Sequence, residues 1–153
     1  MLWLVHILIG MIIGVKFKSP WLVIPIAILS HFILDAIPHW DGNFDKKKFK
    51  KTKSVVINDI DMIVKFLDII GSISVIIFFY MQADKGMMVL GAVMAILPDL
   101  SKVGYLTKLK DTKGYMHYIM FHNNIQGEAS IMDGLSIQAI FFISLVIVLL
   151  HMI

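Results

Sequence analysis

Five apolar segments, separated by polar and lysine-rich stretches, dominate this chain of 153 residues. They cover residues 2–15, 20–37, 55–81, 87–98 and 135–153. A helix needs roughly 20 residues, and about 17 at the least, to cross the hydrocarbon core of a bilayer. The third and fifth segments meet that length and the second just reaches it, whereas the first and fourth need tilt, extension by flanking residues or shielding by other helices. The pattern predicts a polytopic membrane protein.

The composition agrees with this prediction. Hydrophobic residues make up 58% of the chain and charged residues 16%, against about 45–50% and about 25% in soluble domains. Because backbone polar groups inside a bilayer must be satisfied within their own segment, helices are favoured. We therefore expect one all-α membrane domain over residues 1–153, a bundle of four to five transmembrane helices. A basic loop at 41–54 and a long loop at 99–134, with short amphipathic pieces, connect the spans.

The lysines predict the orientation of the bundle. All 14 basic residues are lysines. Ten of them lie in the loops 41–54 and 99–134, which five spans would place on the same side as the N-terminus, and three lie on the opposite side. Cytoplasmic loops carry the excess of positive charge, so we expect the N-terminus and both loops to be cytoplasmic. The net charge of +3 reflects this topology, and we expect lipid, not nucleic acid, as the partner.

Ionisable side chains gather at the same end of the predicted bundle as the basic loops. An ionisable group at membrane depth costs several kcal/mol unless it is paired or ligated, so such a gathering is a candidate functional site. Its members come from all of the first four apolar segments and from the long loop: His6, His31, Asp35, His39, Asp41, Asp59, Asp61, Asp68, Asp99, His117 and His122.

The stretch SHFILDAIPHWD holds the densest part of this gathering. His31, Asp35 and His39 are spaced four apart, and each step of four turns a helix by only about 40°, so a regular helix would align them on one stripe. Pro38 disfavours helix at the residue before it. We expect the helix to end or kink there, so that His39 and Asp41 turn back towards the first pair.

The residue types point to a metal centre. The chain has no cysteine, so imidazole and carboxylate groups are the available ligands; they suit zinc, with manganese or iron as alternatives. A metal held by them activates water and polarises an ester or phosphoryl oxygen, and a remaining carboxylate, Asp35 or Asp41, would act as general base. The candidate metal ligands are His6, His31, Asp35, His39, Asp68, Asp99 and His122.

These motifs also resemble a known family. His6 in the first segment, S-H-x-x-x-D-x-x-P-H-x-D at residues 30–41, an aspartate in the third segment, L-P-D at 97–99 and F-H-N-N-I-Q at 121–126 are together similar to the YdjM-like, membrane-bound, predicted metal-dependent hydrolases of bacteria and archaea. Those are small polytopic inner-membrane proteins, distantly similar to zinc-dependent phospholipase C. The resemblance implies a hydrolase in a prokaryotic cytoplasmic membrane that acts at the cytoplasmic interface on a lipid or lipid-linked phosphoester.

A non-catalytic protein is the alternative. The same His and Asp residues would then form a structural polar network, since polar side chains commonly hydrogen-bond between membrane helices. Such a protein would be an interaction subunit or an ion or proton pathway. A pathway needs polar residues on both sides of the membrane, and the ionisable residues of this chain gather mainly on one side, so the pattern disfavours a pathway and leaves an interaction subunit open.

Overall fold

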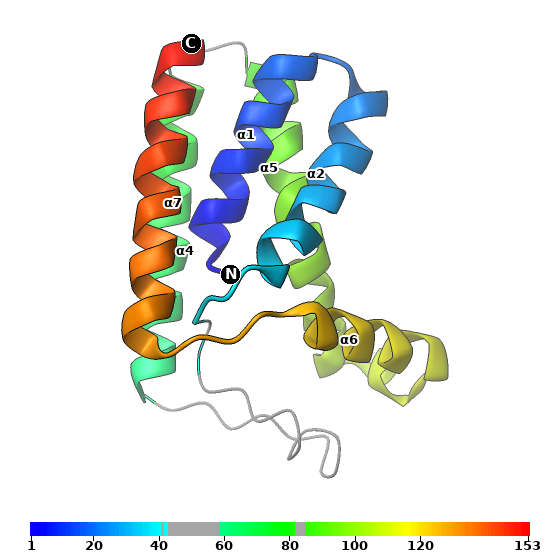
Figure 1. Ribbon diagram of the computed structural model, residues 1–153. Helices are drawn as coiled ribbons and strands as arrows, with labels where there is room; N and C mark the ends of the chain where they lie inside the picture. The colour runs from blue at the N-terminus through cyan, green and yellow to red at the C-terminus, as the bar shows by residue number, and fades with distance from the viewer. Residues whose placement is uncertain (41, 43–58, 82–84) are drawn as a thin grey trace.

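The computed structural model describes residues 1–40, 42, 59–81 and 85–153, which form helices joined by short connections (Figure 1). These described ranges contain no strand, only an isolated bridge between His39 and Glu128, so the prediction of an all-α fold is confirmed. The elements in chain order are α1 (Trp3–Phe17), α2 (Pro20–Ala36), α4 (Asp59–Tyr80), α5 (Lys85–Leu100), the 3-10 helices η1 (Ser101–Leu106) and η2 (Lys108–Asp111), α6 (Lys113–Ile125) and α7 (Ile131–Met152).

Within the described residues, three helical stretches are long and apolar enough to cross a membrane: Asp59–Tyr80, Gly86–Gly104 and Ile131–Met152. The helix at the fourth predicted segment is therefore longer than the apolar run 87–98, because α5 continues through Pro98 and leads directly into η1. α1 and α2 are apolar but have only 15 and 17 residues. The chain therefore has the features of a membrane protein, and a count of four to five spans stays a prediction.

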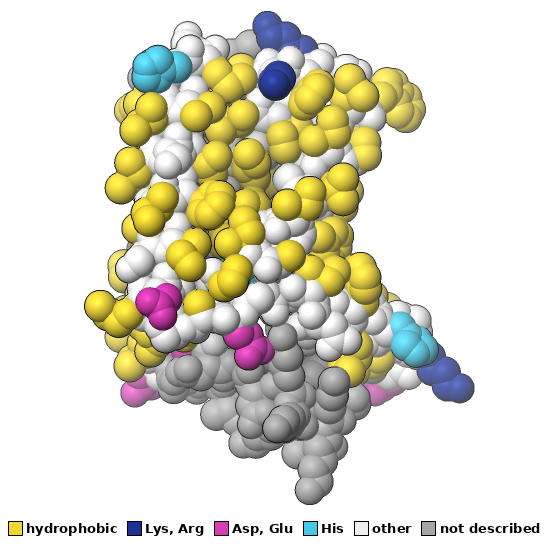
Figure 2. Space-filling view, viewed as in Figure 1, with side chains coloured by type: hydrophobic (Ala, Val, Ile, Leu, Met, Phe, Trp, Pro, Cys, Tyr) yellow, Lys and Arg dark blue, Asp and Glu magenta, His cyan; other side chains and the backbone are white. Residues whose placement is uncertain are grey.

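Apolar side chains cover much of the bundle surface (Figure 2). On α4, Phe66 and Ile77 are 63% and 59% exposed, and on α7, Ile140 and Ile143 are 65% and 57% exposed. Contiguous apolar surface of this kind is rare on soluble monomers and marks contact with a membrane or a partner. Since both helices are long enough to span a bilayer, lipid is the natural environment of these faces.

The short helix α1 lies at the centre of the bundle and contacts α2, α4, α5 and α7 (Figure 1). Nine of its fifteen residues are buried. A helix surrounded by protein on most sides does not itself have to match the thickness of the bilayer, because its neighbours cover it. The central position also brings the start of α1, with His6, next to the other polar residues.

α1 and α5 approach each other through glycines. Gly10 and Gly14 of α1 face α5, as expected of a small-xxx-small pair. A methyl group added at Gly10 would overlap the carbonyl of Gly91, and one added at Gly91 would overlap the carbonyl of Gly10. The absence of side chains at these positions lets the two backbones touch, and it fixes α5, which carries Asp99, against α1.

The end of α2 follows the prediction made from Pro38. The helix ends at Ala36, and Ile37 is extended with ψ 136°. The chain then runs beside the segment that leads from α6 to α7: the Gly127 amide donates to the Asp35 carbonyl at 2.8 Å, and the Ala129 amide donates to the His39 carbonyl at 3.1 Å. These bonds hold the segment between α6 and α7 against the end of α2, next to Asp35.

α6 runs across the lower end of the bundle instead of along it (Figure 1). Two tyrosine hydroxyls hold it to the end of α5 and the start of η1. The Tyr118 hydroxyl donates to the Pro98 carbonyl at 2.9 Å, and the Tyr115 hydroxyl donates to the Ser101 carbonyl at 3.0 Å. One helical turn after Tyr118, His122 is buried and points into the bundle.

Candidate metal centre

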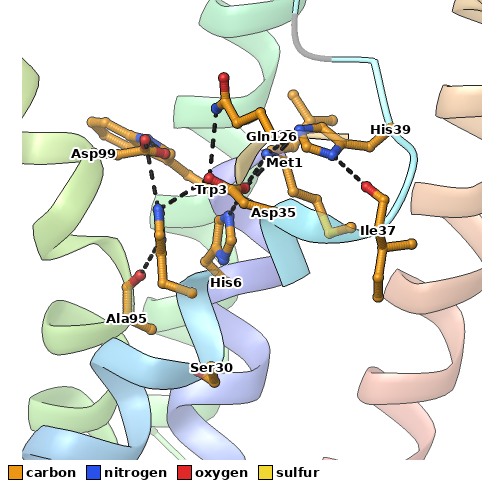
Figure 3. A network of polar contacts seen from close by, with 12 residues as sticks. Met1, Trp3, His6, Ser30, Asp35, Ile37, His39, Ala95, Asp99 and Gln126 are labelled. Atoms are coloured by element: carbon orange, nitrogen blue, oxygen red, sulfur yellow. Dashed lines mark hydrogen bonds and ion pairs between the residues drawn. The ribbon is translucent and has the colours of Figure 1, made fainter. Parts of the chain in front are cut away.

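Asp35, near the end of α2, is the centre of a buried polar cluster (Figure 3). Its side chain is fully buried. Oδ1 lies 3.1 Å from His6 Nε2 and 2.5 Å from the Met1 amino nitrogen. Oδ2 lies 3.3 Å from His31 Nε2 and 3.0 Å from His122 Nε2. The two oxygens therefore face different partners, and Oδ2 faces the pair of histidines that comes from α2 and α6.

A backbone carbonyl fixes the tautomer of His31. Its Nδ1 lies 2.7 Å from the carbonyl oxygen of Ala95 on α5. Because a carbonyl only accepts hydrogen bonds, Nδ1 carries the hydrogen, and in the neutral ring Nε2 then offers its lone pair. In metal sites, a ligating histidine commonly donates a hydrogen bond from one ring nitrogen to a carbonyl and binds the metal with the other. His31 has the matching arrangement, with Nδ1 on the Ala95 carbonyl and Nε2 towards Asp35 and His122.

His122 completes the pair of imidazoles. Its Nε2 is 3.0 Å from His31 Nε2 and 3.0 Å from Asp35 Oδ2. Burial lowers the pKa of His122 below its ordinary value, and the hydrogen bond with Asp35 opposes this shift. The ring is therefore neutral at pH 7, the state in which imidazole binds metals. Its buried Nδ1 has no hydrogen-bond partner among the described residues.

Asp99 of α5 is the fourth member of the cluster. Its Oδ1 lies 3.8 Å from His31 Nε2 and 3.7 Å from His122 Nε2. The indole Nε1 of Trp3 donates to Oδ2 at 3.1 Å (Figure 3), and Lys102 Nζ lies 2.6 Å from Oδ1. These two contacts orient the carboxylate, so that Oδ1 faces the two histidines.

The four residues fit a metal ion by spacing and by chemistry. One ligand atom from each of His31, Asp35, Asp99 and His122 lies within 4.8 Å of all the others, and all four residues are buried. Tetrahedral zinc with ligands at about 2.0–2.1 Å separates neighbouring ligand atoms by roughly 3.3 Å. The His31, His122 and Asp35 atoms are 3.0–3.3 Å apart, while Asp99 lies slightly farther out. Two imidazoles and two carboxylates are ligands that zinc accepts.

Two further predicted ligands, His6 and His39, contact Asp35 without belonging to this group of four. His6 stacks on His31 with ring centroids 4.1 Å apart and lies against Oδ1 of Asp35. His39 turns back as predicted, with Nε2 4.0 Å from the same oxygen, and its Nδ1 donates to the Ile37 carbonyl at 2.8 Å (Figure 3). His6 therefore contacts Asp35 directly, whereas His39 is joined to it by the Met1 amino group, which lies 2.5 Å from both side chains. The role of both histidines as ligands stays a prediction.

Asp68 and Asp41 complete the predicted set. Asp68, buried on α4, accepts hydrogen bonds from the backbone amides of Trp3 at 2.8 Å and Leu4 at 2.9 Å. It therefore caps the start of α1, and the capped residue Trp3 is the one that contacts Asp99. Asp41, the predicted alternative general base, lies outside the described residues.

Several residues around the cluster were not predicted. Trp3 and Lys102 hold Asp99, and Gln126 Nε2 lies 3.5 Å from Asp35 Oδ2. Gln138 on α7 accepts from the Leu2 amide at 2.8 Å and donates to the Trp40 carbonyl at 2.8 Å. A glutamine inside an apolar span is itself a signal, since polar residues at that depth have partners; nothing comparable marks Trp3.

Comparison with known proteins adds no relative. No family model matches the chain, and neither a curated protein nor a solved structure matches it.

Proposed function

We propose that this chain is a membrane-embedded, metal-dependent hydrolase in which His31, Asp35, Asp99 and His122 hold one divalent ion. The observation that carries the proposal is the triangle of His31 Nε2, His122 Nε2 and Asp35 Oδ2, with edges of 3.0–3.3 Å in a buried site. Zinc suits this set of nitrogen and oxygen ligands, with manganese and iron as alternatives.

The protein groups around the triangle prepare it for an ion. The Ala95 carbonyl holds the His31 tautomer that directs a lone pair inwards, and Trp3 turns Asp99 towards the histidines. A divalent ion bound there supplies Lewis acidity towards water and towards an ester or phosphoryl oxygen. Asp35 or Asp41 remains the proposed general base; in Asp35, Oδ2 faces the histidine pair as the ligand atom, which leaves Oδ1 for this role.

The position of the cluster supports a reaction at the membrane interface. It lies at the end of the bundle that α6 crosses (Figure 1), next to long apolar helices. The excess of lysines in the sequence of residues 41–54 and 99–134 favours the cytoplasmic face of a prokaryotic membrane. A lipid or lipid-linked phosphoester is the substrate class that fits such a location, in line with the resemblance to the YdjM-like hydrolases.

A structural network is the second candidate, and one observation favours it. Both oxygens of Asp35 already have partners without a metal: His6 and Met1 at Oδ1, and His31 and His122 at Oδ2. A buried carboxylate with several hydrogen bonds is stable without an ion. The chain would then be a non-catalytic membrane protein, an interaction subunit or an ion or proton pathway.

Metal content separates the two candidates. The protein is purified in mild detergent and its bound metal is measured by mass spectrometry. The hydrolase proposal expects about one equivalent of a divalent metal in the wild type, its loss in a His31→Gln, Asp35→Asn double variant, and its retention in His151→Gln, which alters an exposed histidine at the far end of α7. A metal-free wild type that also binds no added zinc would overturn it.

Catalysis needs its own measurement. The zinc-loaded protein, in detergent or in nanodiscs, is incubated with radiolabelled bacterial phospholipids, and release of a water-soluble product is followed. The expected result is a release that stops in the His31→Gln, Asp35→Asn variant. Stoichiometric metal without any release from a broad set of lipid phosphoesters would assign the metal a structural role.

A further inference from the structure

Lys102 joins the buried cluster to the surface. It belongs to η1, directly after α5, and its Nζ lies 2.6 Å from Asp99 Oδ1. The lysine side chain is 32% exposed, whereas that of Asp99 is 7% exposed. The ammonium group therefore sits where a solute or a lipid headgroup approaching Asp99 from the surface would meet it.

The oxygen that contacts Lys102 is also the candidate ligand atom of Asp99. Oδ1 is the atom that lies 3.7–3.8 Å from the two histidine Nε2 atoms, while Oδ2 is held by the Trp3 indole. An ammonium group carries three N–H donors, so it can contact a carboxylate and another acceptor at the same time. An oxyanion bound to Lys102 would thus lie beside the proposed metal ligands.

The charges of the site favour an anion. Asp35 and Asp99 are the carboxylates of the four-residue group, and together they balance a divalent ion. Lys102, beside Asp99, and the Met1 amino group, beside Asp35, then add positive charge to the site. A neutral ester or amide gains nothing from that charge, whereas an anionic group is attracted by it. The chain contains no arginine, so a lysine is the residue left for contact with phosphate, which lysine binds as a point charge.

We propose that Lys102 is the substrate-binding residue of the proposed metal centre and that the substrate presents a phosphate group to it. This inference rests on the proposed function, because it places the phosphate beside a metal held by His31, Asp35, Asp99 and His122. Phosphate suits the site better than a carboxylate does, because it has more oxygens. One phosphate oxygen can contact the Lys102 ammonium group while another lies at the reacting centre.

The test uses cobalt as a spectroscopic substitute for zinc and inorganic phosphate as the probe. Purified protein in detergent is loaded with Co²⁺, whose visible absorption reports changes next to the ion, and is titrated with phosphate. The variants are Lys102→Met, Lys102→Arg as the conservative change, and Lys108→Met as the matched control. Lys108 is an exposed lysine on the neighbouring η2, so both Met variants remove the same charge from the same region.

The wild type is expected to show a saturable spectral change with phosphate. Lys102→Met should weaken phosphate binding about ten- to hundredfold, the effect of losing a hydrogen bond to a charged group, while retaining Co²⁺. Lys108→Met should match the wild type, and Lys102→Arg should recover part of the affinity. A short-chain phosphatidic acid that binds more tightly than inorganic phosphate, with no response to a phosphate-free diacylglycerol of the same chains, would assign the phosphate to a lipid headgroup.

The results that would contradict the role of Lys102 differ from those that would contradict the proposed metal centre. A wild type that binds Co²⁺ but ignores phosphate and phosphatidic acid overturns the role of Lys102 and leaves the metal centre standing. Equal phosphate affinity in Lys102→Met and the wild type does the same. Loss of Co²⁺ from Lys102→Met and Lys102→Arg alike would make Lys102 a structural partner of Asp99. A wild type that fails to bind Co²⁺ overturns the proposed function, and this inference with it.

Discussion

The Nε2 atoms of His31 and His122 lie 3.0 Å apart, although 91 positions separate the two residues in the chain. Two neutral imidazoles in such contact share at most one hydrogen between their facing nitrogens, and His31 Nδ1 already holds its own hydrogen against the Ala95 carbonyl. The His31 lone pair therefore points at His122 and at Asp35. His122 Nε2 donates its hydrogen to Asp35 in the absence of a metal, and a cation that displaces this hydrogen would be met by two imidazole nitrogens and a carboxylate in a buried site.

Zinc is expected to stabilise the fold through His122. A ligand that binds only the folded state stabilises it by about 2.7 kcal/mol when its free concentration is a hundred times its Kd. Thermal unfolding of the detergent-solubilised protein, followed by circular dichroism, should shift upwards with zinc and downwards with a chelator. The His122→Gln variant should lose most of this shift.

His117→Gln is the matched control for that experiment, because His117 is an exposed histidine on the same helix, α6. It should respond to zinc like the wild type. An equal response in His122→Gln and His117→Gln would mean that zinc binds elsewhere on the protein.

Trp3 is expected to tune the affinity for metal without binding it. Its indole N–H holds Asp99 Oδ2 at 3.1 Å, and removal of a group that orients a metal ligand typically weakens binding about 10–100-fold. Trp3→Phe should therefore lower zinc affinity in a competition assay with a chromophoric chelator. Trp21→Phe should not, because Trp21 is 87% exposed at the start of α2. Unchanged affinity in Trp3→Phe would show that Asp99 does not need this contact.

The local part of the site could be predicted from the sequence. The spacing of four between His31 and Asp35 aligns them on one helical stripe, and the structure brings their side chains to 3.3 Å. The helix end before Pro38 and the return of His39 towards Asp35 follow from the backbone restrictions that proline imposes and are confirmed.

The long-range part could not be predicted in the same way. His122 reaches Asp35 because α6 crosses the end of the bundle, and no local pattern encodes that crossing. The sequence identifies His122 as a candidate ligand, but it does not indicate which residues His122 contacts. Asp68 accepts hydrogen bonds from two backbone amides. Every residue except proline carries such an amide, so the sequence pattern does not reveal this capping role.

Gly91 is expected to be essential for the contact between α1 and α5. A methyl group there would overlap the carbonyl of Gly10, and overpacking of this kind costs typically about 1–3 kcal/mol. Gly91→Ala should lower the melting temperature. Gly86→Ala on the same helix is the control, because an added methyl group meets nothing within 4 Å and alanine favours helix. If both variants melt alike, the two backbones are not in close contact.

Variants of Asp68 can distinguish a role as the cap of α1 from a role as a metal ligand. Two backbone amides at the start of α1 donate to its carboxylate at 2.8 and 2.9 Å, and loss of a helix cap costs about 0.5–2 kcal/mol. Asp68→Ala should therefore lower the melting temperature while the protein still binds about one zinc, and Asp68→Asn, which keeps one acceptor oxygen, should fall between. Asp111→Ala, at the exposed end of η2, controls for loss of a carboxylate. Loss of zinc from Asp68→Asn with unchanged melting of the metal-free protein would instead make Asp68 a ligand, as the sequence predicted.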